Sequence, residues 1–408
     1  MPFAWWTAHQ AKYMTLRTLI FWPHLIAGVL AGSVILLMSA TGVLLTYERQ
    51  LIAWSDSGFR STDAADGRAP LSLEALLTTI RRDHPDLEIS AVTLASYPAA
   101  PVSIAAGRQT VYADAYTGRV LGESAQGVRR FMTQVRAWHR WLAVEGEGRP
   151  AARAITGWSN AIFLFIVASG IYLWFPRKWT WQHVRPVVWF SSGLRGKARD
   201  FDWHNAIGAW SAVPLFIVVL TAMPISFPWA NALVYRVVGE EPPQQGGRGG
   251  REGGPPREDA RRDRPQPALG GLDALVTKAA EQSPGWKTIN LRLPASDRAP
   301  VAFAIDRGDG GQPQLRSTLS LDRSTGAVVN SETFSDQSLG RRLRSISRFA
   351  HTGEVLGLPG QTIAGLATAG AVVLVWTGIA LALRRCRAWI ARRKRTEKLD
   401  PRHQETAA

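Results

Sequence analysis

Cysteine is almost absent from the sequence, in which Cys386 is the only one among 408 residues. A single thiol excludes both a disulfide framework within the chain and a metal site built from several thiolates. Charged residues are absent from four long segments, which are residues 24–47, 154–175, 204–229 and 355–383. At a rise of about 1.5 Å per residue, helices of this length cross a hydrocarbon layer of roughly 30 Å. The sequence therefore predicts four transmembrane helices.

Acidic residues are scarce relative to basic ones, with 32 Asp and Glu against 48 Lys and Arg, which leaves a net charge of +16. Most of this excess lies in residues 1–23, 176–203 and 384–408, which together hold 17 basic and 5 acidic residues. Short segments rich in Lys and Arg stay on the cytoplasmic side of a membrane. We therefore expect both termini and the 176–203 loop in the cytoplasm, and we expect contacts with membrane lipid but no nucleic-acid partner.

Two stretches outside the apolar segments have the composition of soluble domains. Residues 71–84 show helical spacing of leucine and isoleucine, and alternating segments follow at 91–94, 102–105 and 110–113. The same order recurs later in the chain, with a helix at 272–282 and strands at 289–293, 301–305, 315–321 and 327–329. A turn of the form Asp-x-x-Thr-Gly recurs in both sets, at 114–118 and 322–326. These patterns predict two small α+β domains outside the membrane.

The chain thus reads as one unit used twice, in which each unit is a helix, an outer domain and a second helix. The predicted order is a cytoplasmic N-terminus (1–23), a membrane helix (24–47), an outer domain (48–130), a juxtamembrane helix with the second membrane helix (131–175), a cytoplasmic loop (176–203), a third membrane helix (204–229), a second outer domain (230–345), a fourth membrane helix (346–383) and a basic cytoplasmic tail (384–408). Residues 242–267 are almost entirely Pro, Gly, Gln and charged residues, so we expect disorder there.

Two histidines stand at equivalent places at the starts of the first and third helices. His24 is followed four residues on by Gly28, and His204 is followed four residues on by Gly208. Because a chain returns to the same side after every two crossings, both histidines are expected at the inner membrane face. A glycine one turn from such a histidine leaves room for a flat macrocycle, although helix packing is an equally good interpretation of the glycines.

Two further histidines, His139 and His351, each precede the second membrane helix of a unit and are expected at the outer face. Imidazole is a frequent axial ligand of haem iron. An inner pair of His24 with His204 and an outer pair of His139 with His351 therefore predict two haem groups, each with two histidine ligands. One histidine at a helix end is more often a hydrogen-bonded interface residue, and it is the repetition of all four that favours ligands of haem iron.

Haem propionates need cations nearby. Arg140 and Arg348 are candidates at the outer face, because each lies close in sequence to an outer histidine. Further candidates are Arg136 and Arg344 for the outer group and Arg17, Arg177 and Lys178 for the inner group. Binding of lipid headgroups is the alternative role for all of these side chains.

The combination of these motifs resembles the PepSY-associated transmembrane proteins of bacterial inner membranes. The motifs are the two histidine helices with Thr41-Gly42 and Thr221-Ala222, the entrances Trp138–Trp141 and His351–Glu354, the exit Gly170–Arg177, and the two Asp-x-x-Thr-Gly turns. The resemblance implies an inner-membrane protein with PepSY-like periplasmic domains, bis-histidine b-type haems, and a role in reducing ferric siderophores in the periplasm. Ala222, where the first copy has Gly42, and the 242–267 insert depart from the repeat.

The expected function is a transfer of electrons from the inner haem to the outer haem and on to a ferric siderophore or other ferric chelate, which would release the iron. The sequence has no Gly-rich dinucleotide fingerprint and no flavin-domain signature, so a separate electron donor is expected, either quinol or a cytoplasmic reductase. Two alternatives remain open. One is a peptide-binding or protease-regulating PepSY module without redox activity, and the other is a quinol-linked cytochrome b that serves a protein partner.

Overall fold

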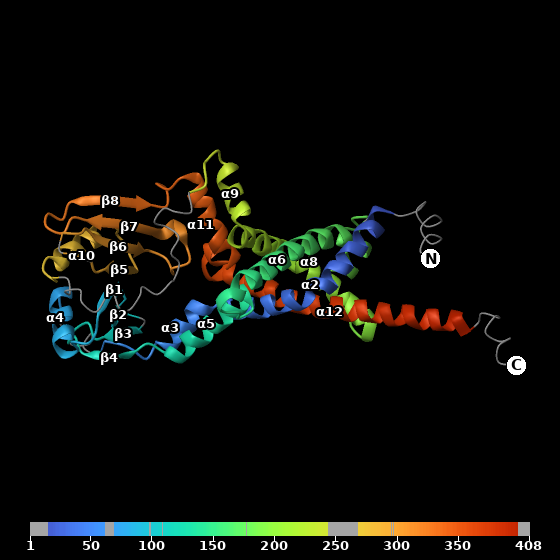
Figure 1. Cartoon of the computed structure of the whole chain (residues 1–408), viewed down its shortest axis with the longest axis horizontal. Coiled ribbons are helices and arrows are strands. Elements are labelled where there is room, and N and C mark those ends of the chain that lie inside the picture. Colours follow the sequence, from blue (N-terminus) through green and yellow to red (C-terminus); the bar gives the residue numbers. More distant parts are fainter. Residues whose placement is uncertain are drawn as a thin grey trace.

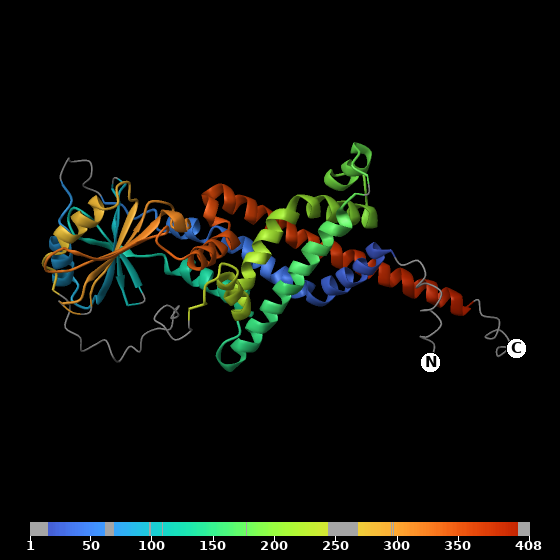
Figure 2. The same ribbon diagram turned by 90° about the horizontal axis from the view of Figure 1, so that it is seen from above.

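The computed structural model describes residues 15–61, 69–97, 99–107, 109–176, 178–243, 268–294, 296 and 298–398. The molecule is elongated, with a β-sheet at one end and a bundle of long helices at the other (Figure 1). Most of the segment predicted to be disordered, from residue 244 to 267, lies outside the described residues. The first long helix of the described residues begins, and the last one ends, at the far end of the bundle from the sheet (Figure 2).

Four helices are long and apolar enough to cross a membrane: α2 (Leu16–Thr46), α6 (Arg149–Trp174), α8 (Gly196–Ser226) and α12 (Gly357–Lys398). Helices α2 and α8 each pack against both α6 and α12. The order around the bundle is therefore α2, α6, α8, α12, and α2 and α8 lie on one diagonal. The four predicted spans are confirmed as apolar helices of membrane-spanning length.

The helices extend beyond the uncharged segments that predicted them. Helix α2 begins at Leu16, α8 begins at Gly196, and α12 continues to Lys398 through the basic segment expected to be a tail. Arg, Lys and Ala all favour helix, so a helix does not stop where its apolar composition stops. Only the length of the apolar part is set by the hydrocarbon layer.

Shorter helices lie between the bundle and the sheet. After α2 come α3 (Glu48–Ser55) and later α5 (Gln126–Trp141), whereas after α8 come α9 (Pro228–Arg236) and later α11 (Leu339–His351). The 3-10 helices η3 (Gly146–Gly148) and η6 (Glu354–Leu356) precede α6 and α12. A further short helix, α7 (Trp181–Val188), belongs to the segment of the chain that joins α6 to α8. Helix α5 packs against α2 and α6, and α11 packs against α8 and α9.

The sheet is built from two similar sets of elements. The first set is α4 (Leu73–Asp83) with β1 (Ile89–Ala95), β2 (Val102–Ala106), β3 (Gln109–Ala113) and β4 (Val120–Glu123). The second set is α10 (Leu272–Glu281) with β5 (Thr288–Arg292), β6 (Val301–Asp306), β7 (Arg316–Leu321) and β8 (Val328–Thr333). A 3-10 turn, η5 (Pro313–Leu315), directly precedes β7. The predicted helices and strands are all present, and β4 was not predicted.

The two predicted outer domains do not form separate sheets. The strand order is β4-β3-β2-β1-β5-β6-β7-β8, because β1 pairs with β5 from Ala91↔Arg292 to Ala95↔Thr288. This pairing satisfies backbone groups that would otherwise form an exposed edge in each half. Alternation along a strand predicts which face is buried but says nothing about the strand that pairs with its edge, so the sequence suggested two domains where the structure has one sheet.

A shared core and a shared helix contact hold the two halves together. Leu76, Leu77 and Ile80 of α4 are buried in the same cluster as Leu272 of α10 and Phe303 of β6. The two helices also cap each other.

At this contact, the backbone nitrogen of Glu74 donates to Oδ1 of Asp273 at 3.1 Å, and the backbone nitrogen of Asp273 donates to Oε1 of Glu74 at 3.2 Å. Each carboxylate therefore satisfies a free N–H group at the start of the other helix.

Candidate functional site

The structure places the four predicted histidines against membrane helices. His24 lies on α2, His204 lies on α8, His139 is near the end of α5, and His351 is the last residue of α11. Helices α5 and α11 rest on α2 and α8 respectively, so all four side chains are associated with the two diagonal helices. His24 and His204 belong to α2 and α8 themselves, and His139 and His351 contact the same two helices further along, at Met38 and Val218.

The outer pair is in close contact. The ring centroids of His139 and His351 lie 6.3 Å apart with an angle of 48° between the ring planes. Nδ1 of His139 donates to the carbonyl oxygen of Met38 on α2 at 2.9 Å, and Nδ1 of His351 donates to the carbonyl oxygen of Val218 on α8 at 2.8 Å. Met38 follows His24 by the same number of residues as Val218 follows His204.

Burial lowers the pKa of both outer histidines, which are carried by helices outside the four candidate spans. The pKa of His139 falls to about 4, first because of burial and then because of the neighbouring charge of His351. The pKa of His351 is also lowered by burial. Both imidazoles are therefore neutral at physiological pH, which is the state that can bind a metal through a ring nitrogen.

The inner pair is held by hydroxyl groups. Nδ1 of His24 lies 2.8 Å from Oγ of Ser169 on α6, and Nδ1 of His204 lies 3.0 Å from Oγ1 of Thr377 on α12. Each hydroxyl donates its own proton to the carbonyl oxygen four residues earlier in its helix, at 2.7 Å for Ser169 and 2.8 Å for Thr377. Its oxygen therefore accepts from the imidazole, which fixes the ring proton on Nδ1.

In all four histidines the hydrogen bond at Nδ1 leaves Nε2 available. No partner for an Nε2 atom is found among the described residues, whereas each Nδ1 has one or two. Axial histidine ligands have this arrangement, in which one nitrogen binds the metal and the other donates to a carbonyl, carboxylate or hydroxyl.

Three imidazoles also lie against glycines of a neighbouring helix. A Cβ atom added at Gly42 would stand 3.4 Å from Cε1 of His139, one at Gly170 would stand 3.5 Å from Cε1 of His24, and one at Gly378 would stand 3.4 Å from Cε1 of His204. The sequence singled out other glycines, Gly28 and Gly208.

A Cβ atom at Gly28 would meet nothing within 4 Å, and one at Gly208 would approach only Leu374 Cδ2, at 3.6 Å. The open space at Gly28 is compatible with the predicted room for a macrocycle. The glycines that touch the histidines lie on other helices, so spacing along one helix could not identify them.

Acidic side chains fix the starts of the two helices that carry the outer histidines. Asp56, which follows α3, accepts from the backbone nitrogen of Ala125 at 2.8 Å and from Nη2 of Arg129 at 2.5 Å. Glu240, which follows α9, accepts from the backbone nitrogen of Gly340 at 3.1 Å and from Oγ of Ser338 at 2.7 Å. The approach of α5 and α11 to the bundle is therefore set at both ends of each helix, by a carboxylate and by a histidine.

The predicted propionate-binding arginines lie in different surroundings. Arg140 stacks over Trp141 at 5.0 Å, and Arg348 stands over the ring of Phe349 at 5.9 Å. Arg17 Nη2 donates to the carbonyl oxygens of Leu173 at 2.8 Å and Phe175 at 2.6 Å, so it closes the end of α6. Two further candidates at the outer face have partners in the protein, since Arg136 pairs with Glu48 and Arg344 Nε donates to Asn231 at 2.5 Å. Arg177 lies outside the described residues.

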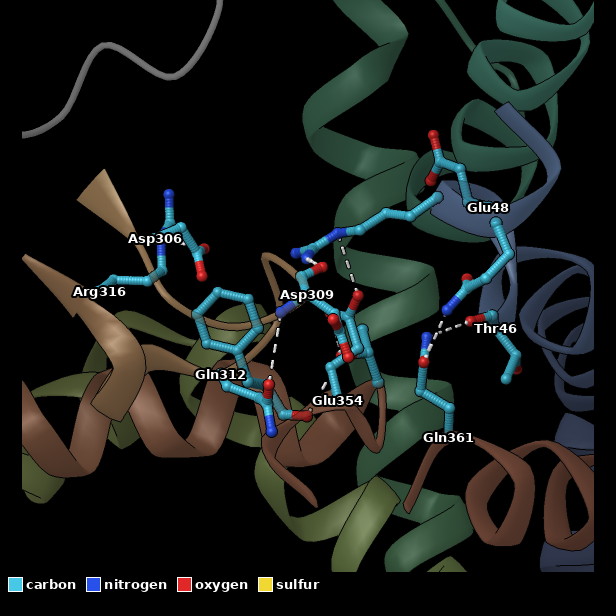
Figure 3. A network of polar contacts seen from close by, with 12 residues as sticks. Thr46, Glu48, Asp306, Asp309, Gln312, Arg316, Glu354 and Gln361 are labelled. Carbon is cyan, nitrogen blue, oxygen red and sulfur yellow. Dashed lines mark hydrogen bonds and ion pairs between the residues drawn. The ribbon is translucent and has the colours of Figure 1, made fainter. Parts of the chain in front are cut away.

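A polar network joins the loop after β6 to α3 and η6 (Figure 3). Glu354, which opens η6 three residues after His351, pairs with Arg49 Nε at 3.1 Å and accepts from Thr352 Oγ1 at 2.7 Å. Arg49 Nη1 also donates to the carbonyl oxygen of Asp309 in the loop after β6, at 3.2 Å. One arginine of α3 therefore connects the sheet to the segment that follows the outer histidine.

The loop after β6 fits tightly around this network. A Cβ atom at Gly311 would stand 2.5 Å from Cβ of Glu354, and one at Gly310 would stand 2.6 Å from Nη1 of Arg49. Gly310 also has a φ of 85°, which glycine adopts without strain. The close approach of loop and bundle therefore depends on glycine.

The spacing of the outer pair would admit one metal ion between the two rings. With metal–imidazole bonds of about 2.0–2.1 Å, two such nitrogens lie about 4 Å apart and their ring centroids about 6 Å apart, which agrees with the observed 6.3 Å. No group of three or more His, Cys, Asp or Glu side chains that could hold a metal ion occurs in the described part of the chain. Sites with only two protein ligands suit a metal that already has four ligands in a tetrapyrrole.

The fold and site define a membrane-type protein with four apolar helices of membrane-spanning length, an antiparallel sheet, and four histidines that are each hydrogen-bonded through Nδ1 to one of these helices. The family model for the PepSY-associated TM region matches residues 21–385. The chain therefore belongs to the PepSY-associated transmembrane family, as its motifs suggested. No curated protein matches the chain in a sequence search.

We expect Glu354→Gln to loosen the contact between sheet and bundle. The Glu354 side chain is only 12% exposed, and loss of its charge weakens a hydrogen-bonded ion pair by about 1 kcal/mol. Amide exchange of residues 306–312, followed by mass spectrometry, should therefore quicken roughly fivefold. The matched control is Glu281→Gln on the exposed side of α10, and unchanged exchange in 306–312 would show that Glu354 does not hold the loop.

Proposed function

We propose that this chain is a bacterial inner-membrane protein that holds two haem b groups and carries electrons across the membrane to a periplasmic ferric siderophore or similar ferric chelate. The observation that carries the proposal is the same hydrogen-bond arrangement at four histidines, which leaves Nε2 free in each. His24 with His204 and His139 with His351 are the proposed axial ligands. When bound, each haem would supply a one-electron Fe(III)/Fe(II) couple.

The placement of the pairs supports transfer across the bilayer. Along α2, His24 and the carbonyl of Met38 that holds His139 are 14 residues apart, or about 21 Å of helix. The same separation relates His204 and Val218 on α8. The two pairs therefore occupy depths separated by about two-thirds of a hydrocarbon layer of roughly 30 Å.

The excess of basic residues in the predicted inner segments supports cytoplasmic termini and a periplasmic sheet. The repeated element order and the equivalent contacts of Met38 and Val218 support an internal duplication, with each half of the sheet as one PepSY-like unit. The electron donor would be a quinol or a cytoplasmic reductase. The arginines of α5 and α11, among them Arg140 and Arg348, are the proposed partners of propionates or of an anionic chelate at the outer face.

The ligand assignment predicts paired losses of haem. His24→Ala and His204→Ala should each remove the same haem, and His139→Ala and His351→Ala should each remove the other, because an iron with two axial histidines loses much of its affinity with either one. Reduced-minus-oxidised spectra of the four purified variants measure this. His183→Ala, which changes an exposed histidine of α7 bonded to Thr180, is the control, and losses in any other pairing would refute the topology.

The substrate assignment predicts fast oxidation of the reduced protein by ferric chelates. Stopped-flow mixing of dithionite-reduced protein with ferric citrate, a ferric trihydroxamate and a ferric tris-catecholate should show the reduced bands decaying with at least one chelate, while a ferrous-specific chelator captures the product. Reduced bands that persist with every chelate would favour a protein partner as the acceptor. A protein that is colourless after expression with haem supplied would favour the PepSY binding module without redox activity.

A further inference from the structure

A local motif recurs wherever one of the four histidines meets a membrane helix. It consists of a serine or threonine followed by glycine or alanine, together with the carbonyl group three residues before the hydroxyl. The four copies are Thr41-Gly42 on α2, Ser169-Gly170 on α6, Thr221-Ala222 on α8 and Thr377-Gly378 on α12. Each of the four membrane helices carries one copy, which we call an imidazole cradle.

In three cradles the hydroxyl lies within hydrogen-bond distance of the histidine, and in the Thr41 cradle Nδ1 of His139 also lies 2.9 Å from the Met38 carbonyl. The hydroxyl lies 3.1 Å from Nδ1 in the Thr41 cradle, 2.8 Å in the Ser169 cradle and 3.0 Å in the Thr377 cradle. In each, the following glycine leaves room for the Cε1 edge of the ring. The hydroxyl also donates to the carbonyl three residues earlier, at 3.1 Å for Thr41 and Ser169 and at 3.2 Å for Thr377.

The fourth cradle has alanine where the other three have glycine. Ala222 replaces glycine and is buried, and the Thr221 hydroxyl bonds to the carbonyls of Ile217 at 2.6 Å and Val218 at 3.1 Å. His351 meets the Val218 carbonyl alone. The other three cradles have glycine at this position, so Ala222 adds one methyl group to its cradle.

We infer that the cradle hydroxyls of Thr41, Ser169 and Thr377 are positioning groups that fix the tautomer and tune the redox potential of the bound couples, and that Thr221 has no such role. This inference rests on the proposed function. A hydroxyl oxygen that accepts from Nδ1–H raises the basicity of Nε2. A more basic axial ligand stabilises the ferric state over the ferrous state, so each hydroxyl lowers the potential of the couple it serves.

The test is a spectroelectrochemical titration of the full-length, haem-loaded protein, with each couple assigned from the histidine variants. Ser169→Ala and Thr377→Val should each shift the inner equilibrium about fivefold toward the ferrous state, which is about 40 mV at 59 mV per tenfold for one electron. Thr41→Val should shift the outer couple in the same direction. Ser169→Thr keeps a hydroxyl and should restore a potential close to that of the original protein.

Thr221→Val is the matched control, because Thr221 has the same place in its cradle but does not touch a histidine ring nitrogen. It should leave both potentials within experimental error. Unchanged inner potentials in Ser169→Ala and Thr377→Val, or an equal shift in Thr221→Val and Thr41→Val, would overturn the inference while the proposed function stands. A haem-free protein would refute the proposed function, and this inference with it.

Discussion

The arrangement of the site depends on the hydrogen bond at Nδ1 of each histidine. An imidazole has two nitrogens, and once one donates to a helix the other is left with a lone pair and a fixed direction. In this protein the acceptor is always on a membrane helix, either a main-chain carbonyl or a serine or threonine hydroxyl. The helices therefore determine both the protonation state of the rings and the direction in which they can bind a ligand.

The rest of the fold serves to bring these rings to the right helices. Helices α2 and α8 lie on one diagonal of the bundle, and α5 and α11 descend from the sheet onto them (Figure 1). Carboxylates at Asp56 and Glu240 hold the far ends of these two helices. Because β1 and β5 join the halves into one sheet, the two helices that carry the outer histidines both follow strands of the same sheet.

Much of this plan could be predicted from the sequence because it depends on local patterns. Uncharged length predicted the four helices, and helical and alternating spacing predicted α4, α10 and most strands. The ends of the helices could not be predicted in this way, since charged residues such as Arg384 continue a helix as well as apolar ones do.

Contacts between distant parts of the chain were not predictable. The pairing of β1 with β5 depends on edges that alternation does not describe. Ser169 and Thr377 were missed because the distance from the outer histidine to the cradle differs between the units, 30 residues from His139 to Ser169 and 26 from His351 to Thr377. The Thr41-Gly42 and Thr221-Ala222 cradles stand out in the sequence only because both follow their inner histidine by the same spacing.

The central claim is that paired imidazoles leave Nε2 free for two irons in one chain. The most direct measurement is the haem content per chain of the purified full-length protein, together with the electron paramagnetic resonance spectrum of its oxidised form. The account predicts two haems per chain, both low-spin with two nitrogen ligands. A single haem, a high-spin ferric signal from an open axial position, or a protein without haem would contradict it.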